Sequence, residues 1–203
     1  MPNTKPVLDT PEQMHYVLEK SKSQGSCRVL PIGAVTVGQQ GETLTDFRAL
    51  SEAGAVAFSD DGVPVTSAVR MRYALKAAKA LHKIVISHCE DGEMVKNYAV
   101  NEGEVSRQLG LPGRPAIAED LMVARDLMLA AETGAHVHIA HVSTKGSAAL
   151  IQGMTLAGVL LDEVALMPRS FVEQALARCS VDGSKFWFNC NPEHPQHWFY
   201  QEW

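Results

Sequence analysis

Three short apolar runs, each followed directly by a carboxylate or a histidine, constrain the fold of this sequence more than any other feature. They are Ala55–Gly62, Lys83–Asp91 and His138–Ser143. Each run has the length of a fully buried strand, and helical patterns lie between the runs. The carboxyl ends of successive parallel strands in an α/β barrel lie on one face, where the chemistry of that fold takes place. We therefore expect Asp61, His88 and His141 to converge at one edge of a parallel sheet.

The segments between these runs predict helices. One expected helix begins at Thr10-Pro11. Three others are expected from about Leu44 to Ala53, from Thr66 or Ser67 to about His82, and from Ile117 to about Ala131. A further strand is expected over Arg28–Thr36, although Pro31 within it suggests a bulge. The alternation favours a parallel sheet with right-handed crossovers, about four βα units of a partial TIM-type barrel. Gly92–Pro115 is longer and more polar than a simple connection, as active-site loops often are.

Composition and charge indicate an ordinary globular protein. Of the 203 residues, 46% are apolar and 20% are charged, and the net charge of −5 gives no reason to expect nucleic-acid binding. The cysteines lack C-x-x-C spacing, which favours reduced thiols in the cytoplasm. No apolar run approaches the roughly 18 residues of a membrane span, and the first residues are too polar for a signal peptide. We expect a cytoplasmic protein without membrane or nucleic-acid partners.

Asp61, His88 and His141 together predict a metal site. Histidines and a shared carboxylate can hold two metal ions that polarise an amide carbonyl and lower the pKa of a bridging water. Strand ends suit such ligands because they are rigid. Each residue alone also has an ordinary structural interpretation, since Asp-Asp-Gly is a common turn and a histidine at a strand end often serves only as a hydrogen-bonding group. The occurrence of all three at strand ends favours the metal site.

Five motifs in the first part of the chain are specific enough to indicate a family. They are Met1–Thr4, Phe58–Gly62, Ile86–Asp91, Val100–Val105 and His138–Thr144. From Met1 to about Ile151 the chain resembles the central part of dihydroorotase, a zinc amidohydrolase of pyrimidine synthesis. The resemblance implies that Asp61 bridges two zinc ions, that His88 and His141 bind the second ion, and that Asn3 contacts the substrate.

Two parts of the family's metal site have no counterpart in this sequence. The family takes a His-x-His pair from an early barrel strand and an aspartate, which also carries the proton, from the eighth strand. The resemblance therefore implies a truncated barrel with at most partial zinc occupancy, and we expect this chain to be inactive.

The residues after about Gly153 resemble a different family. Met154–Pro168 and Ser184–Glu193 are similar to the large subunit of a phage DNA-packaging terminase. That resemblance implies that Asp162 holds the Mg²⁺ of Mg-ATP, that Glu163 orients the attacking water, and that Asn191 belongs to the coupling motif. An apolar strand before Asp-Glu is also an ordinary buried strand. The sequence has no G-x-x-x-x-G-K-[ST] loop to bind the phosphates.

We therefore predict two α/β segments joined in one chain. Residues 1–151 are predicted to form a truncated dihydroorotase-like barrel, and residues 152–203 a fragment of a terminase-like, P-loop-type ATPase domain. The expected reaction is reversible hydrolysis of a cyclic amide, with zinc as cofactor and dihydroorotate or carbamoyl aspartate as the small-molecule partner. The alternatives are a terminase ATPase fragment that uses Mg-ATP, or a chimeric product without function.

Overall fold

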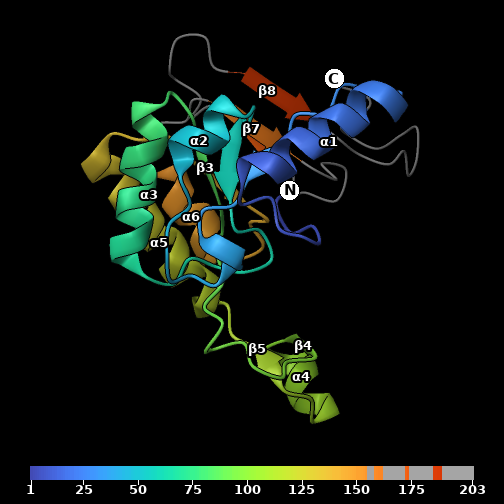
Figure 1. The fold of residues 1–203 in the computed structure, drawn as a ribbon. Coiled ribbons are helices and arrows are strands. Elements are labelled where there is room, and N and C mark those ends of the chain that lie inside the picture. The colour runs from blue at the N-terminus through green and yellow to red at the C-terminus, as the bar shows by residue number, and fades with distance from the viewer. Residues whose placement is uncertain (155–157, 162–171, 174–184, 189–203) are drawn as a thin grey trace. The chain divides into compact units, whose positions relative to one another are not determined.

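The computed structural model describes residues 1–154, 158–161, 172–173 and 185–188 of the chain. The chain divides into two compact units, Met1–Ser147 and Ala148–Trp203. The first unit contains the segments predicted as a barrel, and Figure 1 shows most of its helices around a central sheet. Within the described part of the chain, no helix combines the length and the hydropathy of a membrane span.

A four-stranded parallel sheet forms the centre of the first unit. Its strands, in spatial order, are β1 (Ile32–Gly33), β2 (Ala57–Ser59), β3 (Val85–His88) and β6 (Val137–Ala140). Phe58 of β2 is paired with Val85 of β3, and His88 at the end of β3 is paired with Ala140 of β6. The parallel α/β sheet predicted from the alternating pattern is confirmed.

Helices connect the strands, and local sequence signals explain where they begin and end. The first unit contains α1 (Pro11–Gln24), η1 (Val37–Gln39), α2 (Phe47–Glu52), α3 (Ala68–Ala80), α5 (Ile117–Thr133) and a further helix, α4, described below; α6 (Lys145–Gln152) follows β6. The Asp46 side chain caps α2 by accepting a hydrogen bond from the Ala49 amide, and Ser67 caps α3 through the Arg70 amide. Gly134 ends α5 in a left-handed conformation at φ 61°.

The first strand is shorter than the sequence predicts. The expected strand reached Thr36, whereas β1 ends at Gly33. Pro31 has no amide proton to donate to a neighbouring strand, although its carbonyl accepts from the Val56 amide. Beyond β1, the amides of Val35 and Thr36 donate to the side chain of Asp60. A buried carboxylate therefore takes hydrogen bonds that a longer strand would have used.

The core of the first unit lies between the sheet and the helices. Phe58 is fully buried, and its ring lies 4.1 Å, centroid to centroid, from the ring of Phe47 on α2. Leu50, Leu75 and Val85 are also fully buried and belong to the same cluster. The strand that precedes Asp61 is therefore anchored by large apolar side chains.

The predicted loop between Gly92 and Pro115 contains secondary structure of its own. Within it lie β4 (Val100–Asn101), α4 (Glu104–Leu109) and β5 (Gly113–Arg114), and β4 pairs with β5 in parallel (Figure 1). A side chain at Gly113 would come within 2.6 Å of the Cα atom of Glu102, so the close approach of the two strands requires a glycine there. The sequence analysis identified this connection as long and polar but did not predict the elements within it.

The second unit contains a pair of parallel strands. β7 (Gly158–Leu161) pairs in parallel with β8 (Lys185–Phe188), and β7 lies in the apolar run before Asp-Glu that was interpreted as a strand. Between these strands, Val172 and Glu173 are helical. The assignment of this unit to a P-loop-type domain stays a prediction.

Candidate metal centre

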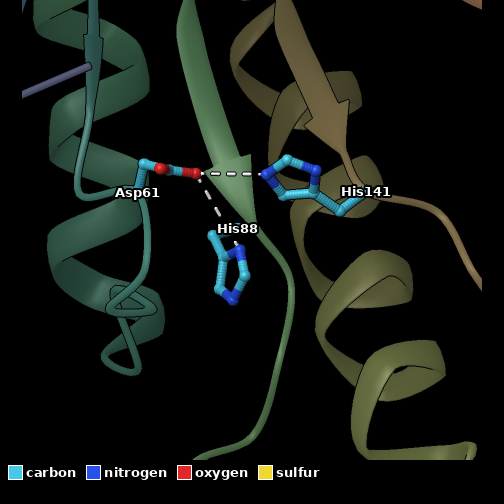
Figure 2. A group of neighbouring side chains, drawn as sticks. All are labelled: Asp61, His88 and His141. Carbon is cyan, nitrogen blue, oxygen red and sulfur yellow. Dashed lines mark hydrogen bonds and ion pairs between the residues drawn. The ribbon is translucent and has the colours of Figure 1, made fainter. Parts of the chain in front are cut away.

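Asp61, His88 and His141 meet at the carboxyl edge of the four-stranded sheet (Figure 2). Asp61 follows β2, His88 ends β3, and His141 follows β6. Asp61 Oδ1 lies 3.3 Å from His141 Nε2 and 4.0 Å from His88 Nδ1. One ligand atom from each residue lies within 4.8 Å of the others. The three side chains thus lie where the strand-end argument places them, and their role as ligands stays a prediction.

The chemistry of these side chains fits a zinc ion. Two imidazole nitrogens and a carboxylate are ligands that zinc commonly takes in proteins. The Nδ1 atom of His88 is buried, yet it has no hydrogen-bond partner among the described residues. Buried polar atoms are nearly always satisfied, so an unpaired nitrogen that faces a carboxylate is the position expected of a metal ligand. A cation bound beside Asp61 Oδ1 would give His88 Nδ1 a partner.

The backbone at His141 has an unusual conformation. Its φ of 57° lies in the left-handed region, which residues other than glycine adopt at a cost of about 1–3 kcal/mol. The side chain is the most exposed of the three, at 67%, compared with 23% for His88 and 17% for Asp61. This conformation brings the His141 ring close to Asp61. The side of the group formed by His141 is open to solvent.

Asp60 and Asp61 are adjacent but have different environments. Asp60 is buried and accepts hydrogen bonds from the Val35 amide at 2.8 Å and from Thr36 Oγ1 at 2.5 Å. Desolvation raises the pKa of Asp60, and the hydrogen bonds from Thr36 and Val35 oppose that shift. Asp60 thus ties the end of β2 to the segment after β1. The next side chain, Asp61, is left at the edge of the sheet.

Asp126 on α5 holds the two residues that flank His88, and sequence analysis missed it. Ser87 Oγ donates to Asp126 Oδ2 at 2.5 Å, and Cys89 Sγ lies 3.6 Å from the same oxygen. Arg125 Nε donates to Asp126 Oδ1 at 2.8 Å. Asp126 is fully buried and lies among apolar residues of α5. A carboxylate on the apolar face of a predicted helix was the sequence signal that could have identified it.

Cys89 should be nearly inert to alkylation in the folded protein. Burial, reinforced by the Asp126 carboxylate, raises the pKa of its thiol to about 12. At pH 8 only about one thiol in 10,000 would be the reactive thiolate. We expect iodoacetamide to modify Cys89 at least roughly 100-fold more slowly than the exposed Cys27. Peptide mass spectrometry of native samples tests this, with denatured samples, in which the two rates converge, as the control. Equal rates in the native protein would contradict it.

Of the other four predicted site residues, one lies beside Asp61, and three lie outside the described residues. Asn3 Nδ2 donates to Asp61 Oδ2 at 3.4 Å, so the residue expected to contact substrate lies next to the carboxylate. Asp162, Glu163 and Asn191 lie outside the described residues.

The comparisons with known proteins divide between the same two families. A family model described as dihydro-orotase-like matches residues 1–147. The dihydroorotase of Geobacillus sp. strain WCH70 is 46% identical over 159 residues, which are 78% of this chain and 37% of that protein. The chain spans little more than a third of the length of the curated relatives it matches.

Two solved structures are similar to parts of the chain. The L-hydantoinase (dihydropyrimidinase) of Arthrobacter aurescens is 21% identical, with a TM-score of 0.53, over 75% of this chain and 35% of that one. This likeness supports the α/β fold. The large terminase of a thermophilic bacteriophage is 60% identical over 33% of this chain and 16% of that one, with a TM-score of 0.31. The terminase resemblance is thereby confirmed as a resemblance of sequence.

Proposed function

This chain belongs to the dihydroorotase-like family, and from that membership we propose that residues 1–147 are part of a TIM-type barrel with part of the zinc centre of a cyclic amidohydrolase. The substrate would be dihydroorotate, or carbamoyl aspartate in the reverse reaction. The observation that supports this most directly is the convergence of Asp61, His88 and His141 from three adjacent strands, with the Nδ1 atom of His88 unpaired.

Each side chain of the group would have a distinct role. Asp61, His88 and His141 would hold the zinc, which when bound supplies a Lewis acid for the amide carbonyl and lowers the pKa of water. Asp61 presents Oδ1 to the two histidines and Oδ2 to Asn3. Asn3 would therefore limit rotation of the carboxylate and place its own amide group beside the substrate. The exposed side of His141 would leave room for that substrate.

The described residues supply three candidate ligands, which is only part of a binuclear centre. Catalysis of amide hydrolysis depends on a complete and preorganised ligand shell. We propose that this 203-residue chain by itself binds about one equivalent of zinc weakly, and that it shows no appreciable turnover of dihydroorotate.

Titration calorimetry with zinc tests the proposed site. The chain should bind zinc, and a double variant, His88→Ala with His141→Ala, should lose that binding because two of the three ligands are gone. A second double variant, His15→Ala with His136→Ala, removes two exposed histidines outside the group and should bind like the parent. Unchanged affinity in the first double variant would place the metal elsewhere. Zinc-dependent turnover that disappears in Asp61→Ala would contradict the expected inactivity.

The terminase-like ATPase stays a hypothesis that rests on sequence resemblance. Asp162, Glu163 and Asn191, to which that resemblance assigns roles, lie outside the described residues. A Walker B carboxylate acts on Mg²⁺ that nucleotide phosphates already hold, and the sequence contains no G-x-x-x-x-G-K-[ST] loop. We therefore propose no ATP hydrolysis for this chain.

A further inference from the structure

We infer that Glu119, in the first turn of α5, is the positioning residue that holds both histidines of the candidate metal centre in place. Glu119 acts on His141 through the residues that follow this histidine, and on His88 through Arg114 and Glu90. The inference rests on the proposed metal centre for its functional meaning. It assigns Glu119 no contact with metal or substrate.

The first arm of this arrangement joins Glu119 to the residues just after His141. The Ser143 amide donates to Glu119 Oε1 at 2.8 Å and the Thr144 amide at 3.1 Å. The Ser143 hydroxyl also donates to the same carboxylate, whereas the Thr144 hydroxyl lies closest to the neighbouring Asp120. Three hydrogen bonds to Glu119 therefore fix the chain two and three residues beyond His141. A histidine in the left-handed region needs such support, because that conformation costs about 1–3 kcal/mol.

The second arm reaches His88 through a series of alternating charges. Arg114 Nη2 lies 3.7 Å from Glu119 Oε2, and Arg114 Nε donates to Glu90 Oε1 at 2.6 Å. Glu90 Oε2 in turn lies 3.7 Å from His88 Nε2. A carboxylate near Nε2 favours the tautomer with its proton on that nitrogen. The lone pair is then on Nδ1, the atom that faces Asp61.

The burial of Glu119 shows that this arrangement is more than packing. Its side chain is only 2% exposed, and a carboxylate in such a place carries a desolvation cost that an apolar residue of the same size would avoid. The amides of the first turn of α5 offset part of that cost, as does Arg114. Among the described residues, the three hydrogen-bond donors to Glu119 come from the segment after His141, so the carboxylate places that segment.

Three variants of the full 203-residue chain test the inference. Glu119→Ala removes both the hydrogen bonds to the segment after His141 and the ion pair with Arg114. Glu119→Gln keeps an oxygen for the two amides but cannot balance the charge of Arg114. Glu132→Gln is the matched control, because Glu132 is an exposed glutamate on the same helix whose partner is Arg72.

The first measurement is the ring ¹⁵N chemical shifts of the histidines in metal-free protein. We expect the signals of His88 and His141 to move in Glu119→Ala while those of His15 and His82 stay. In Glu119→Gln the His141 signals should return toward the parent, and those of His88 should remain shifted. The control variant should match the parent at all four histidines. A role confined to overall stability would not single out these two rings.

The second measurement is Co²⁺ affinity, with cobalt as the spectroscopic probe for zinc. Loss of an outer-shell partner typically weakens metal binding about 10–100-fold, and we expect a loss in this range for Glu119→Ala and a smaller one for Glu119→Gln. Unshifted His88 and His141 signals in folded Glu119→Ala would overturn the inference. If Glu119→Ala does not fold, a Glu119→Gln spectrum identical to the parent's overturns it. A parent that binds no Co²⁺ would refute the proposed metal centre, whereas the ring signals would still decide the role of Glu119.

Discussion

Replacing Asp61 with alanine should weaken zinc binding by roughly 100-fold or more. Asp61 Oδ1 is the atom that both histidines approach, at 3.3 Å from His141 Nε2 and 4.0 Å from His88 Nδ1. Outer-shell partners typically contribute about 10–100-fold to metal affinity, and a direct ligand at the centre of the group should contribute at least the upper end of that range. Titration calorimetry on the parent and on Asp61→Ala measures the difference.

The loss should be specific to this carboxylate. Asp46→Asn is the matched control, because it also removes one acidic group, while asparagine still caps α2. Its zinc affinity should equal that of the parent. Thermal unfolding of both variants establishes that they are folded. If folded Asp61→Ala binds zinc as tightly as Asp46→Asn, Asp61 is not a ligand.

Replacing Phe58 with alanine should destabilise the first unit by about 3–5 kcal/mol. The side chain is fully buried on β2, and it packs against Phe47 of α2 with the ring centroids 4.1 Å apart. Close packing leaves little room for neighbours to fill the cavity that this change creates. Because most domains are stable by only about 5–15 kcal/mol, the loss is a large part of the total. Urea unfolding followed by circular dichroism measures it.

An exposed aromatic residue provides the comparison for Phe58. Tyr73 on α3 is 55% exposed, so Tyr73→Ala should change the free energy of unfolding by no more than about 0.5 kcal/mol. Phe58→Ala should also weaken zinc binding, since Asp61 follows the strand that Phe58 anchors. Similar unfolding midpoints for the two variants would show that the core is not organised around Phe58.

The sequence was sufficient to predict the parallel sheet and the meeting of the three polar residues at its edge. Both follow from local patterns, because an apolar run predicts a buried strand and parallel strands place their carboxyl ends together. The contacts that hold the group were not predictable in this way. Asp60, Asp126 and Glu119 accept hydrogen bonds from residues 25, 39 and 24 positions away, and no periodicity relates such partners.

The segment from Gly92 to Pro115 shows a second limit of local patterns. It was predicted only as a long polar connection, and it contains β4, α4 and β5. Ser106 Oγ accepts a hydrogen bond from the Gly103 amide and caps α4, and Gly110 ends the helix at φ 63°. Those end signals were present in the sequence. The strands are only two residues long, too short to show alternation.

Buried carboxylates hold the neighbours of each candidate ligand through hydrogen bonds within the protein. Asp60, the residue before Asp61, accepts a hydrogen bond from the Val35 amide. Asp126 holds the residues on either side of His88, and Glu119 holds the segment after His141. In zinc fingers, by contrast, the ion drives the folding of the chain. Here the hydrogen bonds to the carboxylates lie within the protein, so we expect folding to precede metal binding. Biogenesis would then proceed in two separate stages.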